Sequence, residues 1–209
     1  MKKLVLFAAV AVFGLTTMTA QEVRLGAKAG VNFASIGGDG TDGVDGRTSF
    51  HVGGLVEIPI SEKFSVQPEL LYSSQGAKSE YTEDFGFGVT ADVEEKLKLD
   101  YINIPILAKF YVAEGFSLQA GPQIGFLVSA NAEIEYSAEG ESDSEDADVS
   151  DFYSGLDLGV GAGAGYRLNN GVFFQARYVL GLSNINDFEG SDDFKNQNNV
   201  IQVSVGYSF

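Results

Sequence analysis

VIQVSVGYSF, residues 200–209, alternates strictly between apolar and small or polar residues up to Phe209. A period of two is the pattern of a β-strand whose two faces meet different environments. A strand with an intact apolar face templates aggregation when an edge stays unpaired, so we expect partners on both of its sides. The stretch therefore predicts a closed β-barrel that this strand completes.

Seven further segments show the same alternation. They cover residues 23–33, 50–60, 64–75, 99–111, 116–129, 155–166 and 172–183. Short gaps alternate with long polar gaps, the short ones at 61–63, 113–115 and 167–171 and the long ones at 34–48, 77–98, 130–154 and 184–199. Short turns at one end and long loops at the other are typical of membrane barrels. The sequence predicts an all-β fold, an eight-stranded antiparallel up-and-down transmembrane β-barrel with short periplasmic turns and long extracellular loops.

The apolar face of each segment would contact lipid, and the opposite face would line the lumen. Each segment is close to the roughly 9–11 residues that a tilted strand needs to cross a bilayer. Outward aromatic residues gather at the two ends, as the girdles of membrane barrels do. The expected inner girdle is Phe64, Phe110, Phe116, Tyr166, Phe174, Tyr207 and Phe209, and the outer one Phe33, Phe50, Tyr72 and Phe126.

The first 20 residues have the order of a secretory signal peptide. Lys2 and Lys3 precede an apolar run over residues 4–15, and small or polar residues lead to Ala20. We expect cleavage after Ala20, which leaves residues 21–209 as one outer-membrane β-barrel domain. No apolar run in this part is long enough for a transmembrane helix. The expected location is the bacterial outer membrane.

Composition narrows the classes of partner. The chain has no Cys, and the mature part carries 29 acidic against 11 basic residues once Lys2 and Lys3 are removed. Such a negative balance excludes nucleic acid as a plausible partner. Stability must come from packing and hydrogen bonding rather than from disulfides.

Four prolines fall inside the predicted strands, at Pro59, Pro68, Pro105 and Pro122. Each removes one ladder donor, and a closed barrel has no edge strand to accommodate it. All four lie near a short turn, so we expect β-bulges close to the periplasmic rim.

Several segments resemble the PorT-type outer-membrane β-barrel family. They are Gly26–Phe33, Gln67–Tyr72, Tyr101–Lys109, Ala120–Gln123 and Ala176–Leu182. The resemblance covers nearly the whole mature chain and includes the prolines. It implies an eight-stranded outer-membrane barrel of a family in which most members have no assigned activity. Its namesake is linked to a protein-secretion system, but these motifs are barrel motifs and do not carry that role over.

Charged residues on the inward faces predict a network in the lumen. They are Lys28, Glu57, Glu69, Lys109, Asp157 and Arg177. An eight-stranded barrel is filled by its own side chains, and buried charges need partners. We interpret the set as a structural salt-bridge network; the alternative is a proton or ion path.

Enzymatic activity is not expected. His51 is the only histidine, and no Ser stands in a nucleophile elbow, so a catalytic triad would depend on His51 at the outer start of its strand. Some outer-membrane barrels are proteases or acyltransferases with Asp, His and Ser at the extracellular rim. The simpler reading is a hydrogen-bonded rim histidine. No cofactor is expected.

The long gaps hold 22 of the 29 acidic residues. The third gap has nine carboxylates and no Lys or Arg, so it would repel itself and stay mobile unless neutralised. In the first, Asp39, Asp42 and Asp45 alternate with glycines and are weak candidates for calcium ligands, although their spacing is not that of an EF-hand. The alternative is a solvated surface that divalent ions bridge to lipopolysaccharide.

Two classes of function remain. The first is a non-enzymatic barrel with a structural role or with loops that bind an extracellular or envelope protein. The second is a narrow pore or a component of a transport or protein-secretion system, which eight strands disfavour. A soluble lipocalin-like barrel would need its apolar face inside. Other expected partners are outer-membrane lipid and the barrel-assembly machinery, which would read Tyr207 and Phe209 as an insertion signal.

Overall fold

The computed structural model describes residues 23–41, 43–86, 89–138, 141–188 and 190–209. The predicted signal peptide, residues 1–20, and Asp42 lie outside these ranges. The strands are β1 (Arg24–Gly38), β2 (Asp45–Ser61), β3 (Phe64–Gly86), β4 (Val89–Tyr111), β5 (Phe116–Ala138), β6 (Glu141–Asp148), β7 (Leu156–Arg167), β8 (Val172–Gly181) and β9 (Asn196–Ser208). Two 3-10 turns, η1 (Ser150–Phe152) and η2 (Ser191–Asp193), interrupt the outer connections. Among the described residues, no helix is long and apolar enough to cross a membrane.

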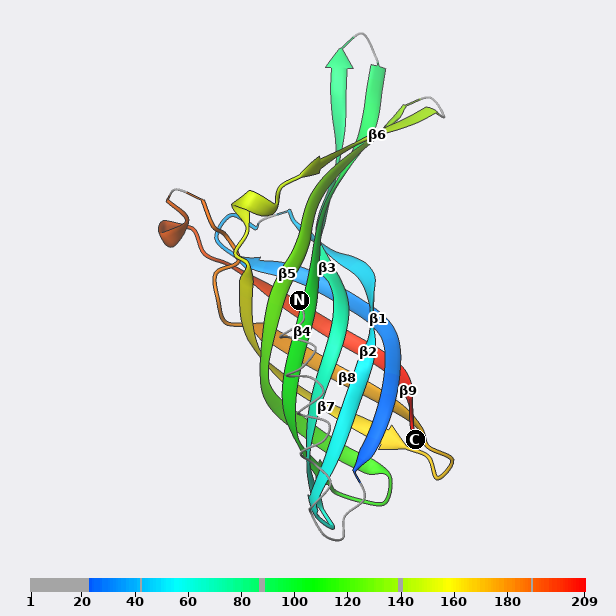
Figure 1. The fold of residues 1–209 in the computed structure, drawn as a ribbon. Helices are drawn as coiled ribbons and strands as arrows, with labels where there is room; N and C mark the ends of the chain where they lie inside the picture. Colours follow the sequence, from blue (N-terminus) through cyan, green and yellow to red (C-terminus); the bar gives the residue numbers. More distant parts are fainter. Residues whose placement is uncertain (1–22, 42, 87–88, 139–140, 189) are drawn as a thin grey trace, which may run out of the picture.

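Eight of the strands in the described ranges close into a ring of antiparallel neighbours. The order runs β4-β3-β2-β1-β9-β8-β7-β5, and β5 returns to β4. β9 pairs with β1 on one side, from Gly26 opposite Ser208 to Gly38 opposite Asn196, and with β8 on the other. The terminal stretch therefore has partners on both sides, as predicted, and the eight-stranded up-and-down barrel is confirmed (Figure 1).

The two faces of the wall differ as the alternation predicted. Side chains on the outer face are apolar and exposed, among them Leu25, Val203 and Phe174. Inward side chains such as Asn32 and Gln67 are polar and buried. A barrel with a polar lumen and an apolar belt is suited to lipid, and the lipocalin-like alternative has the opposite arrangement.

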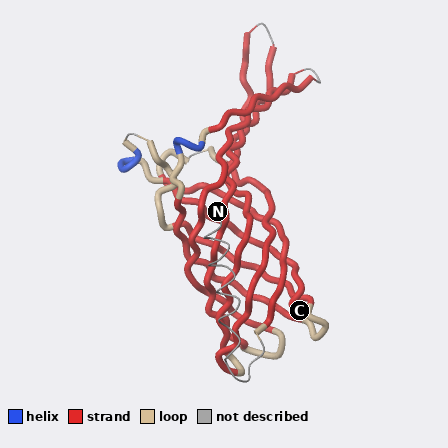
Figure 2. The backbone as a smooth tube through the Cα atoms, in the orientation of Figure 1, coloured by secondary structure: helices blue, strands red, loops and turns tan. Residues whose placement is uncertain are grey.

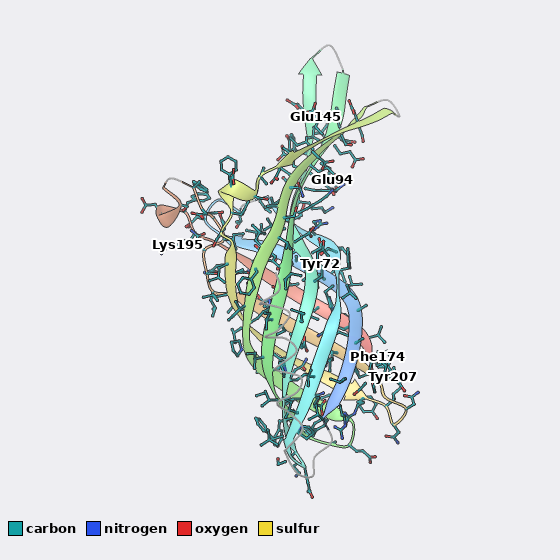
Figure 3. All side chains as sticks on the ribbon, in the orientation of Figure 1. Tyr72, Glu94, Glu145, Phe174, Lys195 and Tyr207 are labelled. Atoms are coloured by element: carbon teal, nitrogen blue, oxygen red, sulfur yellow. The ribbon has the colours of Figure 1, made fainter. Side chains whose placement is uncertain are left out.

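Aromatic side chains mark the two ends of the belt. Phe174 and Tyr207 project outward near the short-turn end (Figure 3). The rings of Tyr207 and Phe209 meet edge to face with 5.3 Å between centroids. At the outer end Phe50 on β2 lies 5.8 Å from Tyr72 on β3. Such pairs lie where aromatic rings anchor barrels at the membrane–water interfaces.

Only one of the four prolines lies at a bulge. The register of β2 against β3 shifts between Pro59 and Ser61, next to the short turn. The predicted bulges at the other three prolines are wrong, because each keeps its place opposite the next strand of the ring. These pairs are Pro68 with Ile106, Pro105 with Gln123 and Pro122 with Val160.

The reason is that a proline lacks a donor toward one neighbour only. For Pro68 that neighbour is β2, where bridge partners jump from Leu55 opposite Glu69 to Ile58 opposite Val66 in an unchanged register. The ladder thus loses bonds on one side while the other side holds the alignment. An undistorted wall accommodates a proline in this way without an edge.

Two of the four predicted long loops are instead regular β-structure. β3, β4 and β5 each run for 23 residues, well beyond a membrane crossing, and β6 adds to the outer part of β5. Their outer parts form a four-stranded sheet that projects from the barrel (Figures 1 and 2), which we call the ribbon: residues 77–86, 89–98, 131–138 and 141–148. These gaps are polar and show no apolar alternation, so the sequence did not reveal that they form strands that pair with one another.

Lysines of β4 make this sheet compatible with its carboxylates. Lys96 stands opposite Glu133 in the register, and Lys98 is ion-paired with Glu133. The third gap has no base of its own, but its neighbour supplies two. Cross-strand ion pairs thus reach two of the nine carboxylates of this gap, Glu133 and Glu135, and the mobility of the gap stays a prediction.

Candidate functional site

The first candidate site is a cluster of charges midway along the lumen, centred on Glu69 of β3. Lys28 of β1 lies 2.8 Å from Glu69 Oε2, and Arg177 of β8 donates to both carboxylate oxygens at 2.7 and 3.1 Å. Gln67 donates to Glu69 Oε1 at 2.7 Å, and Lys28 donates to Gln175 at 3.2 Å. One carboxylate thus joins three strands that are not neighbours in the ring.

A second cluster surrounds Glu57 of β2, closer to the short turns. Its carboxylate accepts from Lys109 at 2.8 Å, Arg24 at 3.0 Å and the Tyr111 hydroxyl at 2.5 Å, and Arg167 lies 3.6 Å away. Lys109 also donates to Gln67 at 3.2 Å and so connects this cluster to the first. Four strands, β1, β2, β4 and β7, meet at this one carboxylate.

Asp157, the remaining member of the predicted lumen set, lies apart from both clusters. It accepts a hydrogen bond from Ser183 at 2.9 Å, and no ion pair to it occurs in the described part of the chain. The structure therefore brings Lys28, Glu69 and Arg177 together, places Glu57 with Lys109, and leaves Asp157 near the outer rim.

The sequence reading did not single out Arg24, Arg167 or Tyr111. Arg24, Tyr111 and Arg167 all stand at strand ends, where alternation is weakest. Their shared position beside a short turn and next to inward residues is the signal that could have identified them. Below them a hollow of 550 Å³ opens to the periplasmic side, lined by Arg24, Tyr111 and Arg167 among others.

His51 is fully buried in the lumen and held by two side chains. Its Nδ1 lies 2.7 Å from Asn32 Oδ1, and its Nε2 lies 2.7 Å from Ser204 Oγ. The order Asn, His, Ser has the connectivity of a hydrolytic triad. Neither His51 nor Ser204 lines any of the four main hollows of the described residues.

The outer mouth of the barrel is closed by apolar side chains. Leu99, Tyr101, Ala130 and Ile185 form a buried cluster, and Ile36, Leu97, Leu127, Val149 and Tyr153 pack against it. Ile185 comes from the connection between β8 and β9, which folds over the mouth. The lumen charges are thereby separated from the cell exterior.

Above this apolar layer lies a cleft of 370 Å³ between the ribbon and the first, third and fourth connections. Its apolar lining includes Leu97 and Ile134 from the ribbon and Tyr153, Ile185 and Phe194 from the connections. The ring of Phe194 lies against Gly40, where φ is +67° and a side chain would collide with it. We call this hollow the outer cleft.

The base of the ribbon carries dense ion pairs. Lys96 lies 2.8 Å from Glu94 and 3.1 Å from Glu135. The hydrogen bond to Glu94 raises the pKa of Lys96, and the hydrogen bond from Lys98 lowers the pKa of Glu133. Figure 3 shows Glu94 at this base and Glu145 farther out along the ribbon. Within the described residues, Asp143 and Glu145 form no ion pair.

The predicted calcium ligands are not brought together as a site among the described residues. Asp39 accepts a backbone hydrogen bond from Lys195 at 3.0 Å, and Asp45 begins β2, while Asp42 lies outside the described ranges. Within those ranges no group of three or more His, Cys, Asp or Glu is placed to hold a metal ion.

Comparison with known proteins gives a family. The sequence profile described as "Outer membrane protein beta-barrel domain" matches residues 19–187. A comparison with curated proteins found no match. Among solved structures, the chain is similar to Ail, the attachment invasion locus protein of Yersinia pestis, at 14% identity over 90% of this chain and 100% of that one, with a TM-score of 0.47.

Two further similar structures are Neisserial surface protein A and the outer membrane protease OmpT from Escherichia coli. The first is 11% identical over 90% of this chain and 100% of that one, with a TM-score of 0.49. The second is 9% identical over 91% and 99%, with a TM-score of 0.36. Since the family profile covers most of the sequence and the strands close into the expected ring, this chain belongs to the outer-membrane β-barrel domain family and is a protein of the bacterial outer membrane.

Proposed function

We propose that this protein is a non-enzymatic barrel that binds a partner at the cell exterior through the ribbon and the connections beside it. The observation that supports this most is the ribbon itself, which continues three wall strands beyond the membrane as ordered sheet. A rigid scaffold that carries an exposed element is the usual arrangement for recognition.

The ribbon has one face suited to contact. Tyr81 on β3 and Tyr136 on β5 flank Val93 of β4 in the register, and both rings are largely exposed while Val93 is buried beneath them. Exposed tyrosines on a rigid sheet are typical anchors of interfaces.

The interior of the barrel supports the proposal because it disfavours the two alternatives, a pore and a hydrolase. Two charge clusters and the apolar layer at the mouth fill the lumen, which disfavours a steady pore. The only histidine of the chain is fully buried between Asn32 and Ser204, which disfavours hydrolysis. The PorT-type grouping within the family is part of this proposal and is supported by the segments around Glu69 and Lys109, which form the clusters.

Site-specific photo-crosslinking on intact cells tests the proposal. A photo-crosslinking amino acid in place of Tyr136 should give adducts with an external or envelope protein. The same amino acid in place of Tyr178, which is at least as exposed but faces lipid, should give none of these adducts. Identical adducts from both positions, or none from position 136, would contradict a role for the ribbon.

A shortened chain completes the test. Replacing residues 80–94 and 134–145 with Asn-Gly turns would close the hairpins at Ser79 opposite Glu95 and at Glu133 opposite Asp146. The barrel should still show heat-modified gel mobility, and crosslinks from a probe placed at Tyr153 beside the ribbon base should disappear. If they persist, recognition does not depend on the ribbon.

A further inference from the structure

The outer cleft combines an apolar interior with carboxylates at its rim. Its volume of 370 Å³ falls within the range of small-molecule sites. The lining comes from β1, β3, β4, β5 and β9 and from the first, third and fourth connections, so the cleft exists only in the closed barrel. Ile36, Leu97, Tyr153 and Ile185 are shared with the apolar layer below, which gives the cleft a firm floor.

Some charged residues around the cleft are ion-paired with ribbon residues, and others are not. Lys78 and Lys96 line it but are ion-paired with ribbon carboxylates, and Glu133 is paired with Lys96 and Lys98. Asp39 and Glu95 also line it, and neither forms an ion pair within the described residues. Asp39 accepts only the backbone hydrogen bond from Lys195, and Glu95 the hydroxyl of Tyr81 at 2.8 Å.

We propose that the outer cleft binds a small organic cation with an aromatic or branched apolar body. The apolar body would occupy the space between Leu97, Ile134 and Phe194, and the cationic group would meet Asp39 and Glu95. The rings of Tyr153 and Phe194 add faces that attract a cation. The excess of carboxylates at this end of the molecule concentrates cations and repels anions before contact. This inference rests on the proposed function, because it makes the cell exterior the recognition end.

Tryptophan fluorescence provides a direct test, because the chain contains no Trp. The probes are tryptophanamide, a cation, N-acetyltryptophanamide, which is neutral, and N-acetyltryptophan, an anion. With the refolded protein in zwitterionic micelles, tryptophanamide emission should shift to the blue and saturate. We expect the neutral probe to bind about threefold more weakly, as loss of a partly exposed ion pair predicts, and the anion not to saturate. Equal binding of all three probes would overturn the charge argument.

Matched variants separate the cleft from the micelle and from the rest of the surface. Phe194 and Phe188 lie in the same connection with equal exposure, 43%, but only Phe194 lines the cleft. Phe194→Ser should weaken tryptophanamide binding about tenfold, the effect of losing most of one aromatic contact, whereas Phe188→Ser should not. Glu95→Gln should remove the preference for the cation over the neutral probe. Glu83→Gln, on the same sheet face but four residues beyond Ser79, the last β3 residue of the cleft, should retain it.

The outcomes distinguish this inference from the proposed function. If crosslinks at position 136 depend on the ribbon but tryptophanamide does not saturate, the cleft is not a cation site and the function stands. If Phe188→Ser weakens binding as much as Phe194→Ser, the cleft is likewise not the site. Saturable binding that follows Phe194 and Glu95, without ribbon crosslinks, would support the cleft and overturn the protein-binding role.

Discussion

Lys28 on β1 and Glu69 on β3 form an ion pair of 2.8 Å although β2 lies between their strands. Arg177 reaches the same carboxylate from β8, on the other side of β1 and β9. The contact spans the lumen and not the wall, so it holds together strands that share no ladder hydrogen bonds.

Arg177→Leu should therefore destabilise the barrel by about 3 kcal/mol, because it removes a bidentate partner from a buried carboxylate. Heat-modified gel mobility would report a lower unfolding temperature. Lys195→Leu removes a cation from the exposed fourth connection and serves as the control, with no change expected. An unchanged unfolding temperature for Arg177→Leu would contradict a structural role of the cluster.

The two lumen clusters and the apolar layer should block conduction. In planar bilayers the protein is expected to give no steady conductance. The variant that lacks the ribbon but keeps Leu99, Tyr101 and Ile185 should behave in the same way. Stable conductance steps from the unmodified chain would favour the narrow-pore alternative.

Acidification should loosen the ribbon before the barrel. The pKa of Glu133 is lowered by Lys98, so this pair stabilises the ribbon above the ordinary carboxyl value of 4.5, and the contribution is lost as pH falls through the lowered value. The protection factors of the amides in residues 131–138, which compare the observed exchange with that of a free peptide at the same pH, should therefore be lower at low pH than at neutral pH. In Lys98→Met, these protection factors should already be lower at neutral pH, and they should change less with pH. Equal profiles for the two proteins would show that the pair does not support the ribbon.

The hydrogen-bonded Asn32, His51 and Ser204 should have no catalytic effect. Purified protein is expected to hydrolyse ester and peptide substrates no faster than the Ser204→Ala variant. Since His51 is 0% exposed, a probe that modifies active serines should leave Ser204 unlabelled. Labelling that Ser204→Ala abolishes would establish an enzyme.

Phe209 should matter more to assembly than to the folded state. Its ring is 78% exposed and contacts Tyr207, so Phe209→Ala removes little buried surface. We expect slower insertion in the presence of the assembly machinery, measured as the time course of folded gel mobility, with an unchanged unfolding temperature. Phe188→Ala is the control, and equal insertion rates would argue against an insertion signal.

The sequence predicted the wall of this barrel well, because its outer face meets lipid and its inner face meets the polar lumen. Apolar and polar residues therefore alternate along each strand. Residues such as Asn32 and Gln67 could be assigned inward from their spacing alone. The ribbon could not be predicted in the same way, because both of its faces meet water and several of its ion pairs join different strands. Glu133 and Lys98 are 35 positions apart, and nothing local in either segment indicates that they meet.

The candidate sites show the same contrast between features that a local sequence pattern indicates and contacts that depend on distant segments. Inward charges were identifiable, but which of them pair depends on the tilt of strands across the lumen, which separates Asp157 from Glu69. The prolines were recognised as unusual, yet the way the wall accommodates Pro68 depends on which neighbour its missing donor faces. The outer cleft had no sequence signal, because its lining comes from seven separate stretches between residues 36 and 196.

β3, β4 and β5 pass without interruption from the periplasmic rim to the ribbon, each with 23 residues. At about 3.3 Å per residue such a strand is about 75 Å long. The wall and the ribbon thus share three continuous strands. A force applied to a partner bound outside would be transmitted along these backbones into the membrane-spanning wall. Glu69 and Lys109 lie on two of the three strands near their inner ends. Their ion pairs across the lumen would resist the displacement of these strands under such a force.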